Sequence, residues 1–300
     1  GRLVGLREGP NMRRSFDLAK IKFRGQKLSV QALYGKEVDP QFGVFDNEFN
    51  LFNEGANNPI VWSIGVQLLA YNQQANLEIY YTGFESKMSR LSDVVGEEMR
   101  HSIGLRSYGK LGTNWSFNTE LIYQFGDLAG SNISAFNFEG DWKYTFVNAK
   151  WKPAIGLKLD WSSGDQEIGD DKLNTFNPLF VNPAIYSLAG INTPANLTSL
   201  HPSITVVPAT SFSIFIDYAI FFRTSKADGL YSPPRFLTRM ASDISETHIG
   251  DALGIQMNYE FNRNISADVR CTYYLPGKFL ELSGESESTF YVAPTLSFKF

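Results

Sequence analysis

Apolar and polar residues alternate along much of this chain, in one long segment after another. In the segment 211–223, one face carries Phe212, Ile214, Ile216, Tyr218, Ile220 and Phe222. The other face is mixed and carries Ser211, Ser213, Asp217 and Arg223 beside Phe215, Ala219 and Phe221. A period of two residues is typical of a β-strand. The segments run over roughly 10–14 residues, which exceeds a typical soluble strand and suffices for a tilted strand to cross a membrane.

The same alternation predicts thirteen strands. They are expected near 15–24, 26–35, 60–69, 74–84, 98–109, 114–125, 133–147, 150–162, 198–207, 211–223, 247–261, 264–275 and 287–300. Short turns are expected around Gly25, Asn72, Lys110, Asn148, Ala209 and Asn262, and longer connections at 36–59, 85–97, 126–132, 163–197, 224–246 and 276–286. Short periplasmic turns that alternate with long outer loops are typical of a transmembrane antiparallel up-and-down β-barrel. We therefore predict a single all-β barrel domain over residues 1–300, embedded in outer-membrane lipids.

The last predicted strand ends on an aromatic residue. Phe290, Val292, Leu296, Phe298 and Phe300 share one face. This ending resembles the signal by which the barrel-assembly machinery recognises bacterial outer-membrane proteins, and Phe300 is the predicted contact. An ordinary last strand that happens to end in Phe is the alternative. If Phe300 is periplasmic, thirteen strands leave residue 1 on the outer side. Both ends of such barrels are normally periplasmic, so further N-terminal strands are expected, and residues 1–8 could supply the end of one.

Composition agrees with a barrel and excludes other classes. The 300 residues include 24 Phe and 14 Tyr, and mean hydropathy is only −0.19, with no apolar stretch approaching the roughly 18 residues of a membrane helix. The net charge of −4 argues against nucleic acid as a partner. Cys271 is the single cysteine, so neither a disulfide framework nor a cysteine metal site is expected. Nothing in the sequence calls for a cofactor or a metal.

Four ordered segments resemble the alginate export family of outer-membrane barrels. They are "RLVGLREGPNMRRSFDLAKIKF" at the start, "GLKLDWSSGDQEIGDDKLNTFNPLF", "PANLTSLHPSI" and "DGLYSPP". The resemblance implies an 18-stranded barrel, of which this chain would hold about 13–14 strands. It also implies passive export of an anionic polysaccharide, a polyuronate, through a lumen lined with arginines.

The polar faces of the strands carry the candidate pore-lining residues. The basic candidates are Lys20, Lys22, Arg100, Arg106, Lys158, Arg223 and Arg270, and the acidic candidates include Glu120, Asp160 and Asp217. Further acids on these faces are Glu78, Glu139, Asp141, Glu260 and Asp268. Rings of Arg or Lys favour anions, because guanidinium groups pair with carboxylates. The acids can also neutralise the bases, and a weakly selective general porin is therefore the alternative.

The connection 163–197 is the longest, and part of it is too apolar for a free loop. We expect Phe176, Asn177, Pro178 and Phe180 to fold into the barrel and narrow it, or else to pack against neighbouring loops. The same loop carries Asp165, Glu167, Asp170 and Asp171. This group could hold calcium, but its spacing fits no EF-hand and a solvated acidic loop is the simpler interpretation.

No catalytic motif surrounds the three histidines, His101, His201 and His248. A membrane-embedded hydrolase, with His201 as a candidate, is the alternative from another class. Trp62, Trp115, Trp142 and Trp161 fall on the outward faces near strand ends, which predicts an interfacial girdle and not a sugar-stacking platform. The sequence therefore predicts a channel, not an enzyme, for passive diffusion of a polar, anionic solute.

Overall fold

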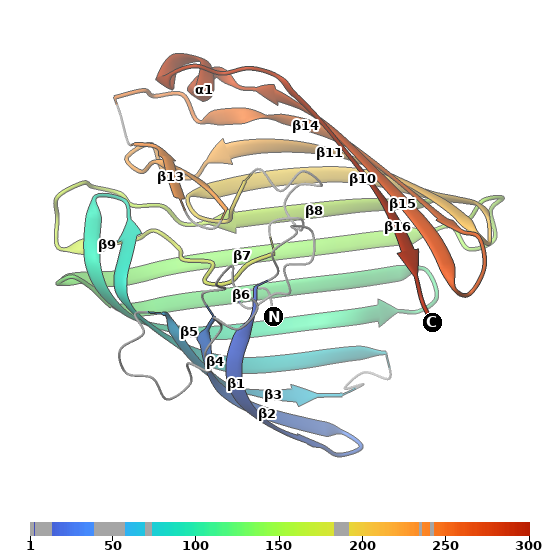
Figure 1. The fold of residues 1–300 in the computed structure, drawn as a ribbon, viewed down its shortest axis with the longest axis horizontal. Coiled ribbons are helices and arrows are strands. Elements are labelled where there is room, and N and C mark those ends of the chain that lie inside the picture. The colour runs from blue at the N-terminus through green and yellow to red at the C-terminus, as the bar shows by residue number, and fades with distance from the viewer. Residues whose placement is uncertain are drawn as a thin grey trace.

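A computed structural model describes residues 3, 14–38, 58–69, 74–182, 192–233, 236–240 and 243–300. Thirteen long strands form one antiparallel sheet in the order of the sequence (Figure 1). They are β1 (Phe16–Arg24), β2 (Leu28–Glu37), β3 (Ile60–Leu68), β4 (Ala75–Leu91), β5 (Val94–Leu111), β6 (Trp115–Leu128), β7 (Ser131–Thr145), β8 (Ala154–Ser162), β10 (Leu197–Ala209), β11 (Phe212–Arg223), β14 (His248–Glu260), β15 (Ile265–Pro276) and β16 (Thr289–Phe298). The prediction of thirteen long antiparallel strands is confirmed.

Smaller elements lie in the connections at one end of the sheet. The two-residue strand β9 (Lys172–Leu173) pairs in parallel with β7, and β12 (Leu230–Ser232) pairs with β13 (Phe236–Arg239). The helix α1 (Lys278–Ser283) follows β15. In the described part of the chain, no helix has the length and apolar character needed to span a membrane.

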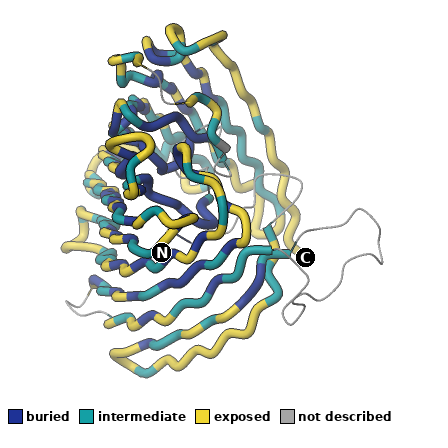
Figure 2. The backbone as a smooth tube through the Cα atoms, turned by 90° about the vertical axis from the view of Figure 1, so that its left-hand side faces the viewer, coloured by how far each residue is buried: buried dark blue, intermediate teal, exposed yellow. Residues whose placement is uncertain are grey.

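The sheet curls without closing. β1 and β16 are its two edges. They are connected only through the other long strands of the sheet, each of which pairs with its neighbours in sequence order. Figures 1 and 2 show the curl, whose hollow side receives part of the connections.

Two expected loops are wrong. Residues 85–97 and 126–132 belong mostly to strands, because β4 and β5 continue to a tight turn at Ser92, and β6 and β7 to a turn at Ala129 and Gly130. Ser92 and Ala129 adopt φ of 53° and 49°, and Gly130 follows at 92°. Two successive residues with positive φ suit the right-handed twist of a hairpin. The sequence hid these hairpins because their strands are polar beyond the apolar band.

The two faces of the sheet differ in chemistry. The outward side chains are apolar and exposed, and examples are Ile64, Ile79, Ile103, Leu121, Phe136, Ile155, Ile204, Leu253 and Leu296. The inward positions are mainly polar or covered by loops, and buried residues alternate with exposed ones along much of central strands such as β5 and β7 (Figure 2). Exposed apolar residues on the outer face suit contact with lipid.

Aromatic rings collect on the outward face near the short turns. Trp115 packs edge-on against Tyr144 with ring centroids 5.0 Å apart, and Tyr144 packs on Phe146. Trp62, Trp142 and Trp161 also lie on the outward side, paired across strands with Tyr34, Phe117 and Phe138. This placement fits membrane-interface anchors.

We predict that Gly126→Ala destabilises the sheet by roughly 3 kcal/mol, since the position combines left-handed backbone with a backbone clash. Gly126 has φ of 138°, and a Cβ there would lie 2.1 Å from the carbonyl oxygen of Met99 on β5. Gly112→Ala is the matched control, because φ is 65° but nothing lies within 4 Å. We expect a cost of about 1 kcal/mol for the control. Urea titration of the protein in lipid would measure both, and equal losses would contradict the clash.

Candidate functional site

The inner face of the curled sheet carries rows of polar side chains in register. Because residues two apart share a face, the paired positions line up from strand to strand. One row contains Arg24, Ser29, Gln67, Glu78, Arg106, Glu120, Glu139, Asp160 and Ser199. The structure thus brings four carboxylates and two guanidinium groups into one band across the wall.

Arg106 lies near the middle of this row between two acids. Its guanidinium is 3.7 Å from Glu78 and 3.9 Å from Glu120, and Nε donates to Asn118 Oδ1 at 2.8 Å. The group also lies 4.3 Å above the ring of Tyr108. Arg106 remains one-fifth exposed, so it lines the hollow, but its charge is largely balanced by its neighbours.

Lys158, Asp160 and Asp217 belong to a second cluster, on β8, β10 and β11. Asp160 accepts a hydrogen bond from Ser199 at 2.9 Å and lies 4.0 Å from Lys158. His201 lies between the acids, 3.7 Å from Asp160 and 3.2 Å from Asp217. Lys158 and Asp217 are partly exposed, whereas Asp160 is closed off from solvent.

At the β15 side of the wall, Arg270 pairs with Asp268 on the same strand at 2.8 Å. Asp268 also accepts from Gln256 Nε2 at 2.6 Å. The Arg270 side chain is 37% exposed, so it faces the hollow with its charge partly balanced.

The edge strand β1 presents exposed bases. Lys20 and Lys22 lie on the inward face, paired with Leu33 and Gln31, and both are exposed. Arg24 continues the same alternation and was missed, although the spacing of two residues could have found it. Two further exposed inward bases that were missed are Lys110 and Lys143, which flank Ser116 in one row.

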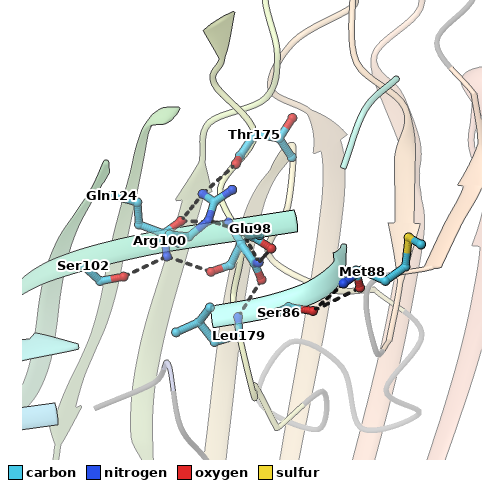
Figure 3. A network of polar contacts seen from close by, with 9 residues as sticks. Ser86, Met88, Glu98, Arg100, Ser102, Gln124, Thr175 and Leu179 are labelled. Atoms are coloured by element: carbon cyan, nitrogen blue, oxygen red, sulfur yellow. Dashed lines mark hydrogen bonds and ion pairs between the residues drawn. The ribbon is translucent and has the colours of Figure 1, made fainter. Parts of the chain in front are cut away.

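Arg100, expected to line the passage, is instead fully buried under the loop that follows β8. Its Nε donates to Glu98, and its Nη1 donates to Gln124 Oε1 at 2.9 Å and to the carbonyl of Thr175 at 3.3 Å (Figure 3). Burial of both charges is tolerated because they are paired with each other and with the loop. Arg100 therefore anchors the loop and does not meet a solute.

Arg223 is likewise buried, and its role differs from the expected one. Its guanidinium donates to four backbone carbonyls, those of Lys226, Asp228, Ile244 and Glu246, at 2.8–3.2 Å. It also lies 3.8 Å above the ring of Phe279 on α1. Arg223 thus organises the connection between β11 and β14. Glu120 and Asp160 are also almost completely closed off, so neither is open to the passage.

The element Phe176–Phe180 lies on the inner wall, as one of the two expectations had it. Phe176, Leu179 and Phe180 pack with Val61, Tyr80, Phe84, Ile122 and Ala135, which face inward from β3, β4, β6 and β7. Pro178 is buried beside them. This apolar packing places the loop inside the curl, where it narrows the space next to β1–β7.

Asn177 fixes the loop to the wall. Its amide nitrogen Nδ2 donates to Glu98 at 3.0 Å, and its backbone N–H donates to Gln124 Oε1 at 2.9 Å. Gln124 returns a bond to the Asn177 carbonyl at 2.8 Å. Asn177 Oδ1 also accepts from the N–H of Leu179, which has φ of 51°, so the side chain supports a strained turn.

The acidic residues of this loop form hydrogen bonds within the loops. Asp165 is buried and accepts from the backbone N–H groups of Gln166 and Asn174 at 3.1 and 3.2 Å. Asp170 accepts from the N–H of Lys172 at 2.9 Å. Among the described residues, no group of three or more His, Cys, Asp or Glu side chains could hold a metal ion.

The hydrolase alternative has a geometric basis that the sequence did not reveal. Ser199 Oγ lies 3.0 Å from His201 Nε2, and His201 Nδ1 lies 3.2 Å from Asp217. This order matches a serine-hydrolase triad. Ser199 is however 0% exposed, and its hydroxyl is also bonded to Asp160. A substrate carbonyl has no approach to Ser199, so these hydrogen bonds join neighbouring strands of the inner wall.

The comparisons with known proteins agree with the fold. The sequence profile of the alginate export family matches residues 1–293. No curated protein matches the sequence. Similar solved structures include OccK11 (OpdR) of Pseudomonas aeruginosa, which is 12% identical with a TM-score of 0.60 over 100% of this chain and 74% of that chain. OccK5 (OpdH) of the same organism is 13% identical with a TM-score of 0.58 over 98% and 75%. The outer membrane protein OprD of P. aeruginosa is 14% identical with a TM-score of 0.52 over 92% and 68%.

We predict that Arg100→Met costs about 3–5 kcal/mol, because it leaves Glu98 buried without its cation. Arg106→Met is the matched control and should cost about 1 kcal/mol or less, since Arg106 is partly exposed. Urea titrations in lipid compare the two variants. Adding Glu98→Gln to Arg100→Met should recover part of the loss, whereas equal costs for Arg100 and Arg106 would rule out the anchoring role.

Proposed function

Since the chain belongs to the alginate export family, we propose that its inner wall forms a passive path for polar, anionic solutes. The protein is a channel of the bacterial outer membrane. A polyuronate is the solute class that family membership suggests. The proposal needs no cofactor and no energy source, because a solute would diffuse down its own gradient.

The observation that supports anion preference is the unequal burial of the inner-face charges. The inward acids that are withdrawn from solvent are Glu78, Glu98, Glu120, Glu139 and Asp160. The inward bases that remain exposed are Lys20, Lys22, Arg24, Lys110 and Lys143, whereas Asp141 and Glu260 are the exposed acids among the described inner-face residues. A solute in the hollow therefore meets more positive than negative charge, and rings of such charge favour anions.

A weakly selective porin is the second candidate. The pairing of Arg106 with Glu78 and Glu120, and of Arg270 with Asp268, supports it, because balanced pairs produce little net field.

The role of Phe300 in recognition by the barrel-assembly machinery stays a prediction.

We predict a chloride preference for the full-length protein in a planar bilayer, measured as the reversal potential under a KCl gradient. Lys20→Gln, Lys22→Gln and Arg24→Gln together should move the reversal potential toward zero, because they remove exposed inward charge. Lys152→Gln is the control, since this exposed base lies in the short turn before β8. A cation preference, or none, would eliminate the anionic proposal and leave the weakly selective porin.

A further inference from the structure

We infer that Asp165 and Asp228 form a pH-sensitive latch, which holds two outer connections together over the passage at acid pH and releases them near neutral pH. The latch deepens the proposed channel function and, for its effect on conductance, rests on it. The two residues lie in the connections that follow β8 and β11.

Asp228 is the centre of the latch. It is fully buried, and its Oδ2 accepts from the backbone N–H of Asp165 at 2.9 Å and from the hydroxyl of Thr175. Its Oδ1 accepts from the hydroxyl of Tyr231 at 2.7 Å and from the N–H of Gly229 at 2.6 Å. One carboxylate therefore joins the loop after β8 to the loop after β11.

Tyr231 extends the latch to a third segment. Its hydroxyl oxygen accepts a hydrogen bond from the backbone N–H of Ser92, at 2.7 Å, in the turn of the β4–β5 hairpin. The ring packs in a buried cluster with Leu91, Leu128 and Leu173. Movement of Asp228 would thus loosen contacts among three connections at the same end of the sheet.

Burial raises the pKa of both carboxyl groups, and Asp165 is the one that the Asn variant below tests. Its pKa is raised from 3.8 to about 6, first by burial and then by the charge of Asp228, against hydrogen bonds from Asn174, Ser92 and Gln166 that lower it. The charged groups described near this pair include the acid Asp93 and the cation Arg223. Asp93 in the hairpin turn accepts from Gly169, and Arg223 donates to the backbone carbonyl of Asp228 and also interacts with the Asp228 charge. No described cation is bonded to the Asp165 carboxylate.

The sign of the pH effect follows from the raised pKa. The docked loop holds the proton on Asp165 more tightly than a released, solvated loop does, so docking is favoured at low pH. Docking therefore weakens as pH rises from 3.8, where Asp165 of a released loop ionises, to about 6, above which the docked Asp165 is ionised as well and the loss levels off. A difference between 3.8 and about 6 weakens the docking equilibrium by about 100-fold at higher pH.

The two ends of the loop then behave differently. The Asn177 end stays bound to Glu98 and Gln124, which are distant in sequence from the titrating pair. The charge of Glu98 is balanced there by Arg100. β9 stays paired with β7, so release separates residues 164–170 from the connection that carries Asp228. Release at this end widens the passage without detaching Phe176–Phe180 from the wall.

The latch can be tested by a distance measurement that does not depend on channel activity. Spin labels on Ile168→Cys and Lys226→Cys, in a Cys271→Ser background, report the separation of the two connections, since both positions are exposed. In lipid vesicles we expect one narrow distance distribution at pH 5 and a broad, longer one at pH 7.5. Adding Asp165→Asn should keep the narrow distribution at both pH values. The same distribution at both pH values in the protein that retains Asp165 would overturn the latch, even if the Asp165→Asn variant failed to fold.

Planar-bilayer conductance of the full-length protein tests the consequence for transport. We expect conductance to rise as pH increases from 3.8 to about 6, and the rise to be absent in Asp165→Asn. Glu167→Gln is the matched control, because it neutralises an exposed acid of the same loop and should leave the pH dependence intact. A pH-independent conductance alongside a pH-dependent label distance would overturn the gating. Absence of any channel at every pH would refute the proposed function, and the label distance would still decide the latch.

Discussion

Every strand of this sheet must satisfy its backbone hydrogen bonds within the membrane while its two faces meet different surroundings. The antiparallel ladder meets the first demand for the long strands between the two edges, and antiparallel pairing runs from Lys20↔Leu33 on β1 to Cys271↔Val292 on β16. The period of two meets the second. Because a slip of one residue would exchange the faces of a strand, the outer apolar belt also fixes which charges line up inside.

The loops then divide those inner charges into two groups. Charges beneath the loops, such as Glu98 and Arg100, are paired and buried, and they determine where the connections lie. Charges beside the open part of the hollow, such as Lys22 and Lys143, remain exposed to solvent, and the proposed function assigns them the contact with a solute. The same alternation therefore places charges that hold the loops in one part of the wall and charges exposed to the hollow in another. Whether a loop buries the charge distinguishes the two.

The alternation was sufficient to predict thirteen strands and the inward direction of Lys20, Arg106 and Asp217. The apolar character of the loop around Phe176 left two placements open, on the wall or against neighbouring loops. It could not predict the burial of Arg100 or Arg223, because their covering residues are distant in sequence, at Thr175 and Phe279. The proximity of Ser199, His201 and Asp217 was equally hidden, since Asp217 approaches only through strand pairing. The β4–β5 hairpin was missed because polar strands outside the apolar band lack the expected contrast.

The loop that follows β8 is attached at two places whose charged groups differ. At Asn177 the wall supplies Glu98 together with Arg100, so the buried charges are paired. At Asp165 the partner is another carboxylate, and the hydrogen bonds that hold it come from backbone and hydroxyl groups. A buried pair of like charges is stable only while one member is neutral. The first attachment is therefore held by opposite charges, and the second is the one whose strength the titration of Asp165 can change.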